Sequence, residues 1–318
     1  MIIAIHTKPF VQNFWLDAGV GLATRFAVPY FFVATGFFFF KSIDGQNNPT
    51  AILKKYELRM LRFYAVWFVI HTLQNMLRGY FFPPTYYLRH FLLPNNGSIL
   101  WFLPAAMLAV FIVYALSRVM DSKKVLGISI VVWLLGYMMS TLAPAFAGNA
   151  AISGGIGFMQ QNIGIQNGLF FGFPYIALSK VLAEEKPEIK VKRDITGILL
   201  SFLCLGAESI LVVMRLHPTL TFLWMSALPL TYFTFHLTIT VTLKERMVFI
   251  AMRKMSILIY VIHPVVIPVL SSLLEMVGLA DPQNLILFFL TCLVSIGLSQ
   301  LLYILSEKPG CKVLKYLM

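Results

Sequence analysis

The chain has 318 residues, of which 59% are hydrophobic and only 12% carry a charge, and its formal net charge is +12. Soluble domains carry roughly 25% charged residues, so this chain has too few charges to cover the water-exposed surface of a soluble enzyme. Its 28 Phe residues exclude an intrinsically disordered chain, which is poor in aromatic side chains. A polytopic membrane protein remains.

Nine apolar runs approach the length of about 20 helical residues that crosses the hydrocarbon core. In chain order they are residues 26–40, 61–77, 99–117, 125–145, 168–183, 195–214, 220–243, 255–277 and 284–305. We predict an all-α fold, a bundle of transmembrane helices that forms a single integral membrane domain over residues 1–318. The polar, glycine-rich segment 146–167 is predicted to be a flexible outer loop, a candidate lid over a cavity.

Lysine and arginine are distributed unevenly between these runs. Alternate segments hold 20 of the 25 basic residues, and the segments on the other side hold only Lys8, Arg25, Arg78, Arg89 and Arg215. Basic residues concentrate in the cytoplasmic loops of membrane proteins, so this alternation predicts a cytoplasmic C-terminus. The membrane also explains the net charge of +12 better than a nucleic-acid partner does.

The first residues, MIIAIHTKPF, precede the first full run and lie on its outer side. They resemble the outer end of a helix whose inner part, about a dozen residues, would lie upstream. We expect that the natural protein begins earlier and has ten helices, nine full spans and the helix that ends in this outer remnant.

His6 stands at the end of that remnant. Histidine is the usual general base at neutral pH, so His6 is the candidate catalytic residue, although a structural hydrogen bond is the alternative role. Arg59 and Arg62 lie three residues apart at the inner end of the second full run and share a helix face. Together with Lys55 they form a basic cluster that is suited to binding phosphates; anchoring beside anionic lipid is the alternative.

Four further polar or aromatic residues are candidates for binding substrate. Glu208 and His263 lie inside apolar runs, where an ionisable side chain costs roughly 2.5–3.5 kcal/mol and marks a candidate functional site. Structural pairing is the alternative for Glu208, and polar packing at the Pro264 kink for His263. Arg25 and Trp101 lie at outer helix ends, where snorkelling and the aromatic belt are the alternative explanations.

The sequence motifs of several enzyme classes are absent. No nucleophile elbow, phosphate-binding loop or HExxH motif occurs, and the three cysteines show no ligand spacing, so neither a hydrolase nor a metal site is predicted.

The landmarks taken in order resemble the acyltransferase 3 family of integral membrane acyltransferases. The matching segments are AIHTKPF (4–10), RFAVPYFFVATGFFFFK (25–41), KKYELRMLRFYAVW (54–67), ILWFLPAAML (99–108), NGLFFGFPYIALS (167–179), SILIYVIHP (256–264) and YILSEKP (303–309). Several of them are most similar to the membrane portion of the VanT-type serine racemases of glycopeptide resistance.

The resemblance implies a ten-helix bundle in the bacterial cytoplasmic membrane. It also implies transfer of an acyl group, commonly acetyl, from cytoplasmic acyl-CoA as co-substrate to a hydroxyl of an envelope glycan or lipid-linked acceptor. By this resemblance His6 is the helix-one histidine and Arg59 and Arg62 are the basic cluster of the third helix. The family's helix-one arginine would precede Met1. A membrane carrier for a small polar solute such as serine, lined by Glu208 and the intramembrane histidines, is the alternative function, and an envelope scaffold is a third.

Overall fold

A computed structural model describes residues 1–93, 99–185, 188–216, 223–241, 247–279, 281 and 284–308. The described residues form helices and no strand, which confirms the predicted all-α fold. Their contacts divide the chain into two compact units that interleave in sequence. The first unit comprises Met1–Arg25, Arg62–Pro83 and Leu243–Met318, and the second comprises Phe26–Leu61 and Pro84–Thr242.

Six helical segments of the described chain are long and apolar enough to cross a membrane. They are Phe14–Ile43, Ile99–Leu116, Ser122–Ser140, Val191–Val212, Met255–Met276 and Leu285–Ser306, and each overlaps one of the nine predicted runs. A multi-pass membrane protein is therefore supported. The predicted count of nine or ten spans and the cytoplasmic side of the C-terminus stay predictions, and residues 309–318 lie outside the described part.

The other three predicted runs are helical but shorter or more polar. Residues 61–77 belong to α4 (Pro49–Leu77), whose last turns carry His71, Gln74 and Asn75. Residues 168–183 form the π-helical turn η3 (Gly168–Gly172) followed by α9 (Phe173–Glu184). Within 220–243 the described helix is α11 (Ala227–Thr240).

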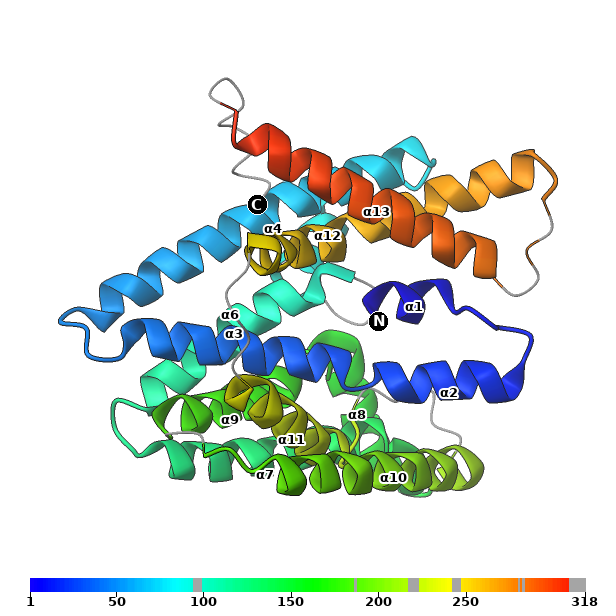
Figure 1. Cartoon of the computed structure of the whole chain (residues 1–318). Coiled ribbons are helices and arrows are strands. Elements are labelled where there is room, and N and C mark those ends of the chain that lie inside the picture. The colour runs from blue at the N-terminus through cyan, green and yellow to red at the C-terminus, as the bar shows by residue number, and fades with distance from the viewer. Residues whose placement is uncertain are drawn as a thin grey trace. The chain divides into compact units, whose positions relative to one another are not determined.

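The first unit contains α1 (Ile2–Thr7), α2 (Phe14–Thr24), the later turns of α4, α12 (Met247–Met276) and α13 (Leu285–Ser306). The helices α12 and α13 lie side by side, and the short α1 contacts both of them and α2 (Figure 1). This arrangement places the first residues of the sequence against its last two described helices.

Two prolines interrupt the backbone hydrogen bonds of α12. Pro264 and Pro268 lie inside the helix, and neither has an N–H to donate to the preceding turn. Two side chains of α4 form hydrogen bonds with carbonyl oxygens of the same part of α12. The Nε2 of His71 lies 3.1 Å from the Val261 carbonyl oxygen, and the Nε2 of Gln74 donates to the Val265 carbonyl at 2.6 Å. The prolines leave the Tyr260 and Pro264 carbonyls without their helical donors, and the two side chains bond the carbonyls that directly follow these.

The second unit contains every remaining element. These are α3 (Ala27–Ile43), the first turns of α4, α5 (Pro84–Leu92), η1 (Ile99–Trp101), α6 (Phe102–Leu116), α7 (Ser122–Ser140), η2 (Ala143–Phe146), α8 (Ala150–Asn162), η3, α9, α10 (Val191–Leu216) and α11. The helix α9 packs against α3, α6 and α7, and α10 packs along α11. Ten of the twelve residues of α9 are buried, so this helix is the centre of the unit.

An aromatic cluster fills the space beside α9. The ring of Phe171 lies 5.6 Å from Phe32 and 5.3 Å from Trp101, measured between ring centroids, and Phe32 lies 5.9 Å from Trp101. All three side chains are buried. Aromatic pairs at such separations stabilise a fold beyond the burial of their apolar surface. These rings therefore stabilise the packing of α3, η1 and η3 against one another.

The start of η3 depends on one amide side chain and one glycine. The side-chain oxygen of Asn167 accepts hydrogen bonds from the N–H groups of Leu169 and Phe170, which begins the helix. A Cβ at Gly168 would lie 2.5 Å from the Ala105 carbonyl oxygen and 2.8 Å from the Leu108 Cβ. Only glycine allows α6 and η3 to approach this closely.

The predicted flexible loop at 146–167 is wrong in one respect. Residues Ala150–Asn162 form α8, and the Asn149 side chain caps it by accepting from the N–H groups of Ala151 and Ile152. The glycines at 154, 155 and 157 lowered the helical expectation, but the N-cap and the intervening apolar residues suffice for a helix.

The close approach at Gly168 makes a specific prediction. Gly168→Ala should destabilise the protein by about 3 kcal/mol, the upper end of overpacking costs, because the new methyl group meets backbone that cannot move away. The thermal midpoint of the detergent-solubilised protein measures this.

Gly157→Ala is the matched control, because a Cβ at Gly157 meets nothing within 4 Å. It should leave the midpoint unchanged or raise it, since alanine favours a helix over glycine by about 1 kcal/mol. Equal midpoints for the two variants would contradict the packing argument.

Candidate functional site

Two histidines from opposite ends of the sequence meet in the first unit. His6 lies on α1 and is exposed, whereas His263 lies on α12 and is fully buried. Their ring centroids are 5.1 Å apart and the ring planes are inclined by 39°. The structure therefore brings together the predicted catalytic histidine and one of the predicted substrate-binding residues.

The short helix α1 presents His6 because its opposite face is buried. Ile3, Ala4 and Thr7 are buried, and the Thr7 hydroxyl donates to the Ile3 carbonyl at 3.0 Å. The helix ends at Lys8, whose φ of 47° is left-handed, and the Lys8 N–H closes the last turn on Ala4. This geometry leaves the imidazole of His6 at the accessible side of the helix end.

The backbone of α12 holds the ring of His263. Its Nδ1 lies 2.9 Å from the Ile259 carbonyl oxygen. A carbonyl can only accept, so Nδ1 carries the proton and the neutral ring has its lone pair on Nε2. That Nε2 is buried and has no hydrogen-bond partner among the residues that the structure describes.

The predicted basic cluster lies along α4. Lys55, Arg59 and Arg62 are all exposed, so their charged groups are available to a ligand. Arg62 belongs to the same unit as His6, whereas Lys55 and Arg59 belong to the second unit. Their role in binding phosphates stays a prediction.

The other predicted binding residues lie elsewhere. Trp101 is 9% exposed and belongs to the aromatic cluster of the second unit. Arg25 follows the last residue of α2 and is half-buried. Their roles in binding substrate also stay predictions.

Glu208 caps a helix. Its carboxylate accepts hydrogen bonds from the N–H groups of Met225 at 2.7 Å and Ser226 at 2.9 Å, and from the Tyr137 hydroxyl at 3.0 Å. Met225 and Ser226 directly precede α11, whose N-terminus attracts negative charge. The carboxylate thus joins α10 to the start of α11 and to α7.

Sequence reasoning missed an ionic cluster between α10 and α11. Asp194 is fully buried, and its carboxylate lies 2.7 Å from the Nδ1 of His236 and 2.8 Å from the Nη2 of Arg193. The Arg193 guanidinium also lies 5.9 Å from the centroid of the Tyr232 ring. The only sequence signal was an adjacent Arg-Asp pair at the start of an apolar run, which is also typical of an ordinary helix beginning.

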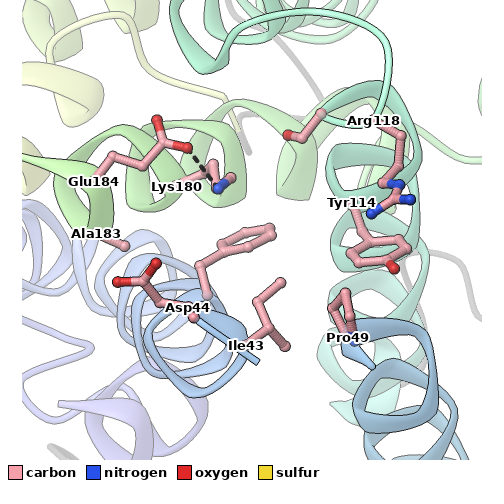
Figure 2. A pocket seen from close by; sticks show the side chains of 11 residues that line it. Ile43, Asp44, Pro49, Tyr114, Arg118, Lys180, Ala183 and Glu184 are labelled. Carbon is pink, nitrogen blue, oxygen red and sulfur yellow. Dashed lines mark ion pairs between the residues drawn. The ribbon is translucent and has the colours of Figure 1, made fainter. Parts of the chain in front are cut away.

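A pocket of approximately 200 Å³ opens at one end of the second unit. Figure 2 shows Lys180 paired with Glu184 on α9, with Tyr114 of α6, Arg118 after α6 and Asp44 after α3 around the same space. The two acidic and two basic groups balance in charge. This balance makes the pocket a poorer phosphate site than the exposed basic residues of α4.

The Lys180–Glu184 pair in this pocket is close and partly shielded. The two charged groups are 2.6 Å apart, and Ser122 also donates to the Glu184 carboxylate. Partial burial raises the pKa of Glu184, but the bonds from Lys180 and Ser122 outweigh it, so the net shift is downward. Glu184 is therefore ionised at neutral pH and ties α9 to the first residue of α7.

No group of three or more histidine, cysteine, aspartate or glutamate side chains in the described part of the chain could hold a metal ion.

Comparison with known families gives this arrangement its context. A family model described as an acyltransferase domain matches residues 1–304. The chain belongs to the acyltransferase 3 family. The predicted family is confirmed, and with its apolar helices the chain is a membrane protein of an acyltransferase family.

Two curated relatives from Enterococcus faecalis are described as amino-acid racemases. One is 28% identical over 143 residues, covering 43% of this chain and 20% of the racemase, and the other is 28% identical over 150 residues, covering 43% and 19%. The chain thus matches only about a fifth of the length of these relatives. No solved structure matches the chain.

The hydrogen bonds of the Glu208 carboxylate lead to a prediction about the stability of the protein. Glu208→Gln should destabilise the protein by about 1–3 kcal/mol, because the amide keeps only one acceptor oxygen for the groups that bond both carboxylate oxygens. The thermal midpoint of the detergent-solubilised protein should therefore fall.

Glu275→Gln is the control, because Glu275 is exposed near the end of α12. It should not move the midpoint. Loss of transfer or uptake in Glu208→Gln with an unchanged midpoint would instead support the predicted role of Glu208 in binding substrate.

Proposed function

We propose that this protein is a membrane-bound O-acyltransferase of the bacterial cytoplasmic membrane. It moves an acyl group, acetyl in the first instance, from cytoplasmic acyl-CoA to a hydroxyl of an envelope glycan or lipid-linked acceptor. The family match over residues 1–304 supports the reaction class. The observation that carries the proposal is the accessible imidazole of His6, which stands beside a second histidine.

His6 acts as the general base. Its imidazole takes the proton of the acceptor hydroxyl while the oxygen attacks the thioester carbonyl of acyl-CoA. The new carbon–oxygen bond forms, the carbon–sulfur bond breaks, and the departing sulfur receives the proton from His6. One ester and one coenzyme A thiol result, and the histidine returns to its neutral state.

Lys55, Arg59 and Arg62 bind the phosphates of coenzyme A. Their exposure on α4 supports this assignment, since a large anionic ligand needs cations that are free to meet it. Arginine and phosphate form strong bidentate hydrogen bonds. The lipid bilayer is the other partner of these side chains and of the protein.

His6→Ala tests the chemical step. The variant should lose transfer from acetyl-CoA by about 100-fold or more, the range expected when a general base is removed, yet it should bind acetyl-CoA as the wild type does. Release of coenzyme A thiol by membranes that contain the full-length protein, with isolated envelope glycan as acceptor, measures the rate. Equal rates in His6→Ala and wild type would refute the catalytic role.

Arg62→Ala tests the binding step. Removing a charge-assisted contact should weaken acetyl-CoA binding by about tenfold, which corresponds to about 1.4 kcal/mol. The half-saturating acetyl-CoA concentration should rise accordingly, with little change in the rate at saturation.

Lys123→Ala is the control, because Lys123 is an exposed cation on a different helix, α7. It should leave the half-saturating concentration unchanged. A similar rise in both variants would mean that general surface charge, rather than a phosphate site on α4, attracts acyl-CoA.

A further inference from the structure

The buried ring of His263 has one nitrogen that the fold does not use. Nδ1 donates to the Ile259 carbonyl, whereas Nε2 is buried with no hydrogen-bond partner in the described chain. Burying an acceptor without a partner costs free energy. No contact of α12 in the described chain uses this second nitrogen.

We infer that His263 is a positioning residue for the acyl transfer: its Nε2 accepts a hydrogen bond from an N–H of His6. The inference rests on the proposed function, in which His6 is the general base. It assigns to His263 a role that neither the family match nor the curated relatives specify.

The tautomer of His263 suits this role. Because the Ile259 carbonyl keeps the proton on Nδ1, Nε2 of the neutral ring is always an acceptor. When this acceptor takes the N–H of His6, the other nitrogen of His6 carries the lone pair. That lone pair is the one that takes the proton of the acceptor hydroxyl.

The separation of the two rings is compatible with this bond. The centroids are 5.1 Å apart, and His6 is exposed on a short helix, whereas His263 is held by its backbone contact. Hydrogen bonds of catalytic groups are often long or misaligned before the substrate binds and shorten afterwards. In this proposal His6, rather than His263, turns to complete the contact.

The consequence for the reaction concerns both orientation and charge. In many triads a carboxylate holds the base in one tautomer and stabilises the imidazolium that forms. No carboxylate is paired with His6 in the described part of the chain, and the neighbouring ring is that of His263. A neutral imidazole orients the base and stabilises the imidazolium through its lone pair, without placing a negative charge in the membrane.

Two amide substitutions separate this role from a structural one. In His263→Asn the amide nitrogen occupies the place of Nδ1 and can still donate to Ile259, but the acceptor at Nε2 is lost. In His263→Gln the amide oxygen reaches the place of Nε2 and can accept from His6, but the donor at Nδ1 is lost. The inference predicts that the glutamine variant is the more active one.

The measurement is coenzyme A release from acetyl-CoA by membranes with the full-length protein and isolated envelope glycan. His263→Asn should lower the rate at saturating acetyl-CoA by about tenfold or more and leave the half-saturating concentration unchanged. His263→Gln should retain a clearly larger rate. Higher activity in the asparagine variant, or full activity in both, would overturn the inference.

His71→Gln is the matched control, since His71 also contacts a carbonyl of α12 and the glutamine amide can replace its donor. It should leave the rate unchanged. Wild-type protein that releases no coenzyme A would overturn the proposed function itself. An active wild type, an inactive His6→Ala and a fully active His263→Asn would overturn only the role of His263.

A second measurement on the unsubstituted protein holds even where the variants unfold. Nitrogen-15 NMR of histidine-labelled protein in lipid reports which ring nitrogen carries the proton. The inference requires His263 to carry it on Nδ1. A proton on Nε2 of His263 would overturn the inference, because that nitrogen could not then accept from His6.

Discussion

The backbone of α12 carries the constraint on which the first unit depends. A helix in an apolar environment must satisfy its own polar groups, because the hydrocarbon core has no water to bond them. Pro264 and Pro268 each lack the N–H that would donate a hydrogen bond within the helix. Side chains from the same helix and from α4 supply donors to its carbonyls, through His263, His71 and Gln74. The buried imidazole of His263 is one of these side chains, and it bonds the Ile259 carbonyl of its own helix.

Close contacts between helices hold the second unit together. The helix α9 is almost wholly buried, and η3 before it runs so near α6 that only glycine fits at position 168. Transmembrane helices that lack a hydrophobic driving force between them associate through such small residues and tight contacts. Two carboxylates of α10 are also bonded: Glu208 accepts from the N–H groups before α11, and Asp194 is bonded by Arg193 and His236. Close helix contacts and bonded buried charges therefore hold the second unit together, whereas His6 belongs to the first unit.

Composition and periodicity predicted the all-α class and the positions of the apolar helices, because each of those properties is local. The family could be identified from short motifs because their order along the chain is itself specific. The pairing of His6 with His263 could not be predicted, since sequence does not reveal which helices meet. Glu208 illustrates a second limit. Its cost inside an apolar run was evident, but the N–H groups that offset this cost lie 17 and 18 residues further along the chain. The helix α8 illustrates a third limit of sequence-based prediction. Its asparagine cap favours the helix more than its glycines disfavour it.

The interleaving of the two units has a consequence for biogenesis. The first unit combines Met1–Arg25 with segments that the ribosome makes last, so it cannot close until α12 and α13 have been inserted. The second unit is nearly continuous and can assemble earlier, since domains generally fold as their residues emerge. The contacts of α1 with α12 and α13 therefore form only late in synthesis. A nascent or prematurely terminated chain has His6 but not His263, and the histidine pair forms only once synthesis of α12 is complete.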